Sequence, residues 1–237
     1  MKEDLSIQKE QGTIYEKLAE KAVEKLNKRG IRAQFAVNKK EALSMVMEMI
    51  PAGTTVGTAD SLTLVQLGIF SSLRKRGQNE IVNPFERDDE GHLLIEEGEE
   101  RYAQMRKVFL TDVFVIGTNA VTLDGKLVNT DGYGNRVAAM IFGPRKVIIV
   151  VGANKIVKDA EEAIKRIREI CAPLNAIRHA NKHHSTTHQL LPCYKTGICS
   201  DCIHPWRRCC YTTIIEGVRK SEQGRINVIL VGEKLGI

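Results

Sequence analysis

Five of the six cysteines in this 237-residue chain lie close together near its carboxyl end, in polar and turn-rich sequence. They are Cys193, Cys199, Cys202, Cys209 and Cys210, which gives the spacing C-x5-C-x2-C-x6-C-C. A C-x2-C pair can bring two thiolates onto one metal through a tight turn, and two further cysteines complete four-coordination. The spacing therefore predicts a metal centre, with a redox-active thiol pair or no shared role as the alternatives.

Thiolate ligands suit both an iron–sulfur cluster and zinc. Lys195, Arg207 and Arg208 lie beside the cysteines in the sequence and would stabilise an anionic centre of either kind. We favour an iron–sulfur cluster, because a centre close to the surface with cations around it suits electron exchange, and zinc is the alternative. The sixth cysteine, Cys171, belongs to the apolar side of a predicted helix and is expected in the core.

Four histidines between residues 175 and 192 could add ligands to this centre. His179 and His183 are four residues apart, as are His184 and His188, and such pairs chelate a metal when they lie on a helix. The simpler interpretation is a solvated insertion, because the surrounding sequence has no helical or strand periodicity.

A second group of polar residues follows a predicted buried strand. Residues 113–117 are apolar and rich in β-branched side chains, and the polar stretch 118–134 comes directly after them. Ligands of open α/β sheets bind beyond the carboxyl ends of such strands. The residues predicted to bind a ligand here are Asn119, Asn129, Asn135 and Arg136.

Within this group we assign specific roles to two side chains. Arg136 is predicted to hold a carboxylate or phosphate, because its planar guanidinium makes a two-point contact. Asp131 is the candidate general base if the site is catalytic. The alternative for Asp131 and Asn135 is a structural role in a turn or a helix cap.

A strand-to-helix turn supplies another candidate binding element. Residues 54–58 form a predicted strand, and a helix ending at Gly77 follows it. The turn offers backbone N–H groups and hydroxyls to an anion, through Gly57, Thr58, Ser61 and Thr63. It is not a Walker loop, since no Gly-Lys-Ser/Thr follows. The alternative is that Asp60 or Ser61 caps the helix.

These candidate residues are carried by regularly alternating elements. Strands are expected at 31–37, 54–58, 80–85, 113–117, 146–151, 212–215 and 227–231. Helices are expected at 5–29, 39–49, 96–110, 135–142 and 158–171, the last one ended by Pro173. The pair Asp124-Gly125 between apolar residues predicts a hairpin turn. Repeated strand–helix alternation predicts an α/β fold with a mainly parallel sheet flanked by helices.

The predicted organisation is a core with a cysteine-rich addition. Residues 1–174 form the α/β core, 175–210 form a histidine- and cysteine-rich metal-binding segment, and 211–237 return to the core as strands. Segment 175–206 shows no periodicity, and a long segment of this kind is uncommon in a compact domain unless it is functional or held by something.

Composition narrows the function classes. The chain is 43% hydrophobic and 27% charged, which is ordinary for a globular protein. Its net charge of +6 is scattered in short runs without interleaved aromatics, so nucleic-acid binding is not expected. No apolar run is long enough to span a membrane, and the charged N-terminal residues do not form a signal peptide. We expect a cytoplasmic protein.

The chain resembles the lactate-utilization domain (LUD) family over almost its whole length. The most specific similarity is in residues 119–138, N-A-x-T-x-D-G-x-L-V-N-x-D-G-x-G-N-R-V-A, followed by G-P-x-K-V at 143–147. Residues 192–209 are similar to the tail of one subgroup, P-C-x3-G-x-C-x-D-C-x2-P-x2-R-C. The resemblance makes Cys209 the fourth ligand beside Cys193, Cys199 and Cys202, with Cys210 as a substitute.

The resemblance also implies a fold and a range of functions. The implied fold is the one shared by ribose-5-phosphate isomerases, glucosamine-6-phosphate deaminases and CoA transferases, with the turn at 57–63 and the loop at 119–136 lining one pocket. Two departures from the subgroup are the longer, histidine-rich stretch 175–192 and Cys210 directly after Cys209. Some members of the family belong to an iron–sulfur system that oxidises L-lactate, and others have no assigned reaction.

Three functional hypotheses follow. The first is a metal-binding component of the redox metabolism of lactate or a related organic acid, which binds a small organic anion, works with other redox subunits and could form homo-oligomers. The second is a self-contained isomerase, hydrolase or transferase that acts on a phosphorylated or CoA-linked small molecule and has structural zinc. The third is a regulatory or accessory module without catalytic activity.

Overall fold

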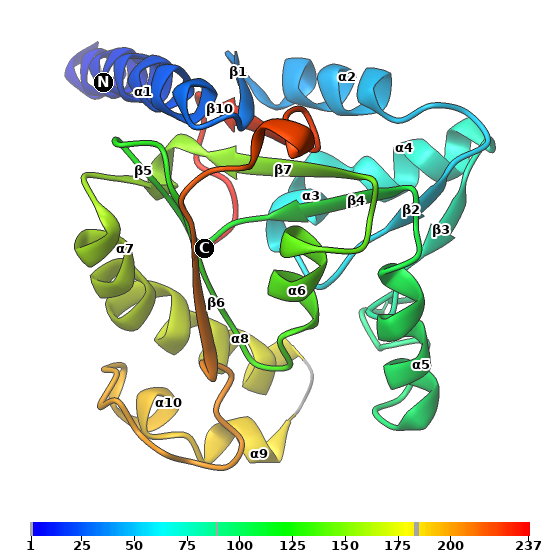
Figure 1. Ribbon diagram of the computed structural model, residues 1–237. Coiled ribbons are helices and arrows are strands. Elements are labelled where there is room, and N and C mark those ends of the chain that lie inside the picture. Colours follow the sequence, from blue (N-terminus) through cyan, green and yellow to red (C-terminus); the bar gives the residue numbers. More distant parts are fainter. Residues whose placement is uncertain (1, 89, 183–184) are drawn as a thin grey trace.

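The main sheet of the protein has six strands in the order β1-β10-β7-β4-β2-β3 (Figure 1). This computed structural model describes residues 2–88, 90–182 and 185–237. All neighbouring strands of the main sheet run parallel, which confirms the predicted mainly parallel α/β architecture. The strands are β1 (Arg32–Ala36), β2 (Thr55–Gly57), β3 (Glu80–Val82), β4 (Val113–Gly117), β7 (Lys146–Gly152) and β10 (Ile226–Val231).

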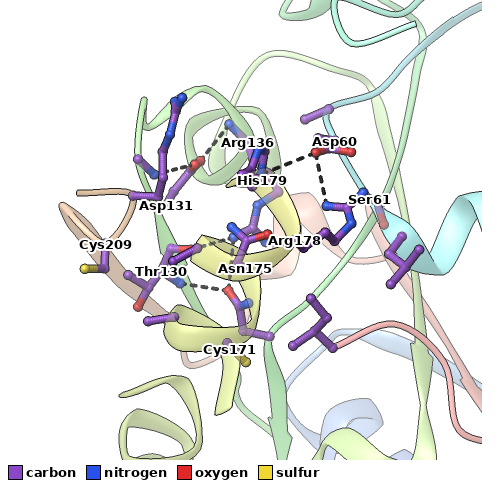
Figure 2. Close-up of a pocket in the computed structure, with 18 of the residues that line it drawn as sticks. Asp60, Ser61, Thr130, Asp131, Arg136, Cys171, Asn175, Arg178, His179 and Cys209 are labelled. Carbon is purple, nitrogen blue, oxygen red and sulfur yellow. Dashed lines mark hydrogen bonds and ion pairs between the residues drawn. The ribbon is translucent and has the colours of Figure 1, made fainter. Parts of the chain in front are cut away.

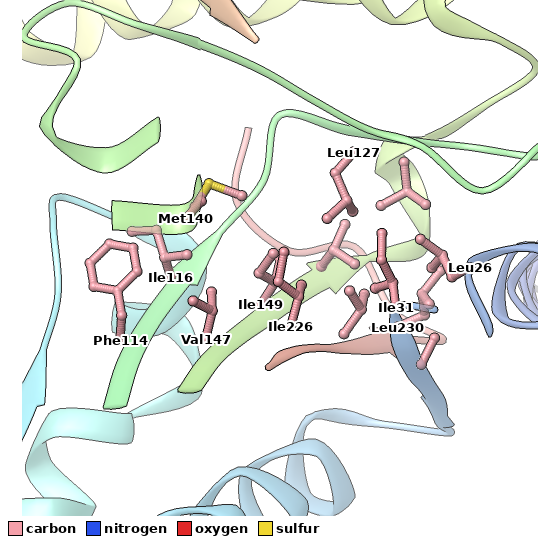
Figure 3. Close-up of a cluster of buried hydrophobic side chains, with 14 of the residues drawn as sticks. Leu26, Ile31, Phe114, Ile116, Leu127, Met140, Val147, Ile149, Ile226 and Leu230 are labelled. Carbon is pink, nitrogen blue, oxygen red and sulfur yellow. The ribbon is translucent and has the colours of Figure 1, made fainter. Parts of the chain in front are cut away.

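The central strands are apolar because both of their faces are buried. Alternate side chains of a strand point to opposite faces, so β4, β7 and β10 each contribute to two separate cores. Phe114, Ile149 and Leu230 lie in the first core, which Figure 3 shows. Their neighbours Val115 and Val150 lie in the second core, on the other face of the sheet.

Different helices cover the two faces of the main sheet. The second core is closed by α2 (Lys39–Met49), α3 (Leu62–Leu67) and α4 (Ile69–Arg76). The first core is closed by α1 (Lys2–Lys28), α6 (Asn135–Ile141) and part of a smaller sheet, with α5 (Glu99–Val108) at its edge. No helix among the described residues has the length and apolar character needed to cross a membrane.

The smaller sheet has the strand order β8-β5-β6-β9. Its strands are β5 (Ala120–Thr122), β6 (Leu127–Asp131), β8 (Ile156–Val157) and β9 (Tyr211–Ile215). The predicted Asp124-Gly125 turn joins the antiparallel pair β5 and β6, with Gly125 at a φ of 87°. This sheet packs between the main sheet and α7 (Ala160–Arg166).

The hairpin tip packs directly on the backbone of α1, and this contact gives a stability prediction. A Cβ at Gly125 would lie 2.5 Å from the carbonyl carbon of Lys25, whereas a Cβ at Gly224, with a φ of 85°, would meet nothing within 4 Å. Gly224→Ala should therefore lower the free energy of unfolding by roughly 1 kcal/mol, from backbone strain alone. Gly125→Ala should cost about 2 kcal/mol or more, because the clash with α1 adds to the strain. Urea unfolding of the two variants measures the difference, and equal losses would contradict the packing argument.

Two predicted helix boundaries are wrong. The helix expected to run unbroken to Gly77 is split into α3 and α4, because Gly68 takes a left-handed conformation with a φ of 68°. The helix expected to stop at Pro173 continues through a π-helical turn at Ile167–Cys171 into α8 (Ala172–Lys182). Pro173 follows the π-helical turn closely, so the residue without a backbone N–H lies where the regular hydrogen-bond pattern of the helix is already interrupted.

The predicted cysteine-rich segment begins within this helix. The boundary expected between residues 174 and 175 falls inside α8, so the first part of the segment is helical rather than irregular. Two short helices follow, α9 (Thr186–Gln189) and α10 (Pro192–Thr196). Figure 1 shows α8, α9 and α10 gathered where the far ends of β6 and β9 also arrive.

Candidate functional site

One cavity of about 430 Å³ lies beyond the carboxyl ends of three parallel strands. Its walls include Ser61 and Thr63 after β2, Asn119 after β4 and Lys155 after β7. Helix α8 and the cysteine-rich segment form the opposite walls. The volume is in the range of small-molecule sites, and the position is the usual one for ligands of open α/β sheets.

Most of the residues predicted from the sequence line this cavity. They are Ser61, Thr63, Asn119, Asp131, Asn135, Arg136, Cys193, Cys199, Cys202 and Cys209. Gly57, Thr58 and Asn129 do not line it. Gly57 packs so closely that an added Cβ would lie 2.6 Å from Oγ1 of Thr111, and the Thr58 hydroxyl donates to the Val115 carbonyl at 2.9 Å. The first two are therefore buried supports of the turn.

Arg136 directs its guanidinium into the protein. Its Nη1 donates to Oδ1 of Asn129 at 2.7 Å and to the Gly117 carbonyl at 3.5 Å. Its Nη2 donates to Oδ1 of Asn119 at 3.0 Å and to the Thr130 carbonyl at 2.8 Å. Burial lowers the pKa of Arg136, while the nearby Asp131 carboxylate opposes this shift. The four N–H groups at the end of the side chain thus join the end of β4 to β6.

Asp131, the last residue of β6, directs its carboxylate to the start of α6. Its carboxylate accepts hydrogen bonds from the backbone N–H groups of Gly132 at 2.7 Å, Arg136 at 3.0 Å and Val137 at 3.3 Å. A carboxylate in this position satisfies N–H groups that have no partner within the helix. Figure 2 shows Asp131 and Arg136 side by side on one wall of the pocket. This geometry is that of the structural alternative, a cap, on a residue that also borders the cavity.

Asp60 forms the centre of an ion-pair group on the opposite wall. Its Oδ2 lies 3.4 Å from Nη1 of Arg178 and 3.8 Å from Nε2 of His179, both on α8 (Figure 2). Burial alone would raise the pKa of Asp60, but Arg178, His179 and Arg87 outweigh burial and lower it. Asp60 therefore stays ionised and holds cations at the cavity. Ser61, at the N-cap position of α3, makes no side-chain cap hydrogen bond.

Lys155 is a site residue that the sequence reasoning missed. It ends the short 3-10 turn Ala153–Lys155 after β7 and is 4% exposed. Burial lowers its pKa from 10.5 to about 8, with repulsion from Arg166 and Arg136 adding to the shift and Cys171 opposing it. A signal was present in the sequence, because this lysine stands alone in the apolar stretch 147–157, directly after a parallel strand.

Cys171 lies in the core, as predicted, and also borders the cavity. It belongs to the π-helical turn before α8, and its Sγ is 2.9 Å from Nη1 of Arg166. The same Arg166 nitrogen donates to the Asn119 carbonyl at 2.8 Å. The arginine therefore links the π turn to the loop after β4.

The four predicted metal ligands lie along one side of the cavity, each partly buried. Asp201, between Cys199 and Cys202, has a φ of 51°, a left-handed backbone conformation that is uncommon for a residue other than glycine. Burial raises the pKa of Cys209 to about 11, and Cys199 and Cys202 add to this shift. Burial and the same two cysteines also raise the pKa of Cys193. The thiols therefore share one electrostatic environment.

The chemistry of these donors fits a metal centre, but the four side chains are not gathered around one point. Within residues 2–88, 90–182 and 185–237, no three His, Cys, Asp or Glu side chains converge closely enough to hold a metal ion. A metal would lower the thiol pKa values that burial raises, because coordination deprotonates a thiol. Binding would require the four thiols to move closer together than they are in this structure.

The cysteine-rich segment is anchored to the wall that carries Asp131. The Cys210 N–H donates to the Asp131 carbonyl at 2.9 Å, directly before β9 pairs with β6. Gly132 allows this approach, since a Cβ there would lie 3.2 Å from Cδ of Arg208. Arg168 near α7 reaches Asp201 at 3.3 Å. The carboxyl end and the middle of the segment are thus tied to the core.

The histidines are only partly described. His183 and His184 lie outside the described residues, so the two predicted i,i+4 pairs stay predictions. The rings of His179 and His188 stack with centroids 5.0 Å apart. His188 Nε2 accepts from Nε of Arg208 at 2.9 Å, and its Nδ1 lies 2.6 Å from the Ser185 hydroxyl. Burial and, to a smaller extent, the charge of Arg208 lower the pKa of His188 to about 4. His188 is therefore neutral, and each of its ring nitrogens has a hydrogen-bond partner.

Comparison with protein families shows the family to which the chain belongs. The sequence profile described as LUD domain matches residues 19–231, which is nearly all of the α/β structure. The chain belongs to the LUD domain family. The resemblance seen in residues 119–138 is therefore confirmed, and the LUD domain includes both the cavity walls from the core and the cysteine-rich segment.

Solved structures similar to this LUD domain share little sequence with it. A DUF162 family protein from Deinococcus radiodurans is 12% identical, with 92% of this chain and 98% of that chain covered and a TM-score of 0.49. The eIF2B delta subunit from Chaetomium thermophilum is 18% identical over 54% of this chain and 50% of its own, with a TM-score of 0.36. Ribose 5-phosphate isomerase from Plasmodium falciparum is 16% identical over 57% and 66%, with a TM-score of 0.31. No curated protein matches the sequence.

Proposed function

We propose that this LUD-family protein binds a sulfur-ligated metal centre and a small organic anion at one site. The proposed ligands are Cys193, Cys199, Cys202 and Cys209, and the proposed centre is an iron–sulfur cluster, with zinc as the alternative. The protein would act in the cytoplasm, in the redox metabolism of lactate or a related organic acid, together with other redox subunits.

This proposal rests on one observation, that the predicted metal ligands and the ends of the parallel strands line the same cavity. The four thiols line the side formed by the carboxyl-terminal segment, and the ends of the parallel strands line the other side. A ligand bound at the strand ends would therefore lie beside the proposed centre. Such proximity favours a shared function over a remote structural metal.

The charge around the cavity favours an anion. Its lining includes seven arginine and lysine side chains and three carboxylate side chains, those of Asp60, Glu97 and Asp131. Asp131 is engaged by three backbone N–H groups and Asp60 by Arg178. An excess of fixed positive charge in a water-poor cleft raises the local concentration of small anions. Arg178 is the best candidate to hold one, because it lies on α8 directly over the cavity.

When bound, an iron–sulfur cluster supplies one-electron transfer at a potential that nearby charge and hydrogen bonds adjust. The residues of the chain supply the remaining parts of the site. Arg178 and Arg87 would orient an anion, and Asp60 keeps Arg178 and His179 on the cavity wall. Arg136 and Arg166 hold the loop after β4 in place.

Metal analysis of protein purified without oxygen tests the first half of the proposal. We expect iron and inorganic sulfide with visible absorption, and at least about tenfold weaker metal retention in Cys199→Ser and Cys202→Ser. Cys171→Ser is the matched control and should keep its metal, because Cys171 lies apart from the segment. Comparison of Cys209→Ser with Cys210→Ser shows which of the two adjacent thiols is the fourth ligand.

Several outcomes would overturn parts of the proposal. Colourless protein with one zinc per chain would support the hydrolase, isomerase or transferase alternative. Absence of any metal in wild-type protein would end the metal hypothesis. Titration calorimetry with lactate, pyruvate and inorganic phosphate tests the anion site, where Arg178→Gln should weaken binding by about tenfold. Equal binding by wild type and Arg178→Gln would contradict the assignment of Arg178.

A further inference from the structure

Lys155 is a deeply buried basic residue of the cavity, and its hydrogen-bond partners are neutral. Its Nζ donates to Oγ1 of Thr63 and to the carbonyl of Thr118, each at 3.2 Å. None of the carboxylates that the structure describes forms an ion pair with it. A lysine that serves only as an anchor is normally paired when it is buried this deeply.

The amine also faces the cavity. Lys155, Thr63, Thr118 and Cys171 all line it. Two N–H groups of the ammonium are used by the threonines, so loss of the third proton leaves a lone pair without breaking either hydrogen bond. Position, burial and hydrogen bonding together present a nucleophile at the end of β7.

We propose that Lys155 forms an imine with a small aldehyde or ketone that also carries an anionic group. This inference takes from the proposed function only that the cavity binds a small organic anion, and it is independent of the metal centre. The carbonyl would lie at Lys155, while the carboxylate or phosphate of the same molecule would be held by the arginines of the opposite wall.

The chemical step is a condensation without electron transfer. The Nζ lone pair attacks the carbonyl carbon, and the C=O π electrons move to oxygen, which takes up the proton lost from nitrogen. The resulting carbinolamine then loses water, and a C=N bond replaces the C=O bond. The attack requires a neutral amine, and burial in a desolvated pocket raises the fraction of the amine that is neutral near pH 7.

The surroundings of Lys155 raise the neutral fraction of its amine. Burial lowers the pKa of the group, the guanidinium groups of Arg166 and Arg136 lower it further, and Cys171 acts in the opposite direction. The neutral fraction of an amine near neutral pH rises about tenfold for each unit by which its pKa falls. Exposed lysines of the same chain therefore provide an internal reference.

Reductive trapping tests this inference on the full-length purified protein. Glyoxylate, pyruvate, dihydroxyacetone phosphate and uncharged acetone are each incubated with the protein and sodium cyanoborohydride. Peptide mapping by mass spectrometry should find one reduced adduct at Lys155 with an anionic carbonyl compound, at least about tenfold more than at any exposed lysine. Acetone should give no such preference, and the carboxylate and phosphate compounds show which anion is recognised.

Variants and a competitor make the result decisive. Lys155→Gln and Lys155→Met should lose the adduct, whereas the exposed control Lys234→Arg should keep it. Propionate, which is anionic but has no reactive carbonyl, should slow trapping in wild type. Adducts spread over exposed lysines would overturn the inference, and so would unchanged trapping in the Lys155 variants. Calorimetric binding of pyruvate or phosphate without trapping would refute the imine but leave the anion site intact.

Discussion

Replacement of Arg136 by methionine is expected to lower the free energy of unfolding by about 3–5 kcal/mol. The guanidinium satisfies the amide oxygens of Asn119 and Asn129 and the carbonyl of Thr130 at distances of 2.7 to 3.0 Å. Methionine fills a similar volume but donates nothing, so the three hydrogen bonds from the guanidinium are lost, while the two amide oxygens keep backbone N–H donors from Asn119 and Thr130. A hydrogen bond to a charged group contributes about 1.5–3 kcal/mol.

Urea unfolding of Arg136→Met, compared with the exposed control Arg219→Met, measures this loss. The control should change the unfolding free energy by less than about 0.5 kcal/mol. Arg136→Lys should recover only part of the loss, because one ammonium cannot replace a planar fork of donors.

The same experiment separates two roles for Arg136. A residue whose main work is to hold a ligand would tolerate substitution with little change in stability, while anion binding would disappear. A stability loss below about 1 kcal/mol combined with lost anion binding would therefore favour the role predicted from the sequence. A large loss would favour the role that its four hydrogen bonds indicate.

Lys155→Met is expected to change the pH dependence of stability by about 3 kcal/mol. The pKa of Lys155 is lowered from 10.5 to about 8 on folding, chiefly because of burial. Below about pH 8 the lysine is protonated in both states, so folding must bury a charge and stability is reduced. Above pH 10.5 it is neutral in both states and this penalty is absent. Wild-type stability should thus rise relative to the variant as the pH increases between these two values.

Parallel urea titrations from pH 7 to pH 10.5 measure the difference between wild type and Lys155→Met. The variant should be the more stable protein at pH 7, apart from the loss of two hydrogen bonds worth about 1 kcal/mol each. That advantage should shrink as the pH rises. Lys234→Met, at an exposed position, should give a difference that does not vary with pH. A constant difference for Lys155→Met would show that its amine has an ordinary pKa.

The sequence by itself determined the elements that are controlled by local chemistry. Apolar, β-branched runs identified β4, β7 and β10, since a strand buried on both faces must be apolar at every position. Asp124-Gly125 identified the hairpin, because its turn requires positive φ, and Gly125 has a φ of 87°. Residues 119–138 identified the family that the profile match confirms.

Local chemistry was insufficient where a helix depended on its context. Pro173 is an ordinary stop signal, yet the helix continues past it, because the π-helical turn just before it already interrupts the regular hydrogen-bond pattern. The order of strands was also not readable, because β10 from the end of the chain inserts between β1 and β7. Such pairing depends on surfaces far apart in the sequence.

Only the tertiary structure decided what the polar residues of the cavity do. Donors and acceptors can be counted from a sequence, but their partners depend on which distant oxygens lie within 3 Å. Arg136 donates to acceptors on the loop after β4 and on β6, while Asp131 accepts from N–H groups at the start of α6. Lys155 donates to two threonines and pairs with no described carboxylate, because folding buries the end of β7 beside the loop after β4 and the start of α3. Burial and partner choice are properties of the assembled chain, so the residue types were visible from the sequence and their roles were not.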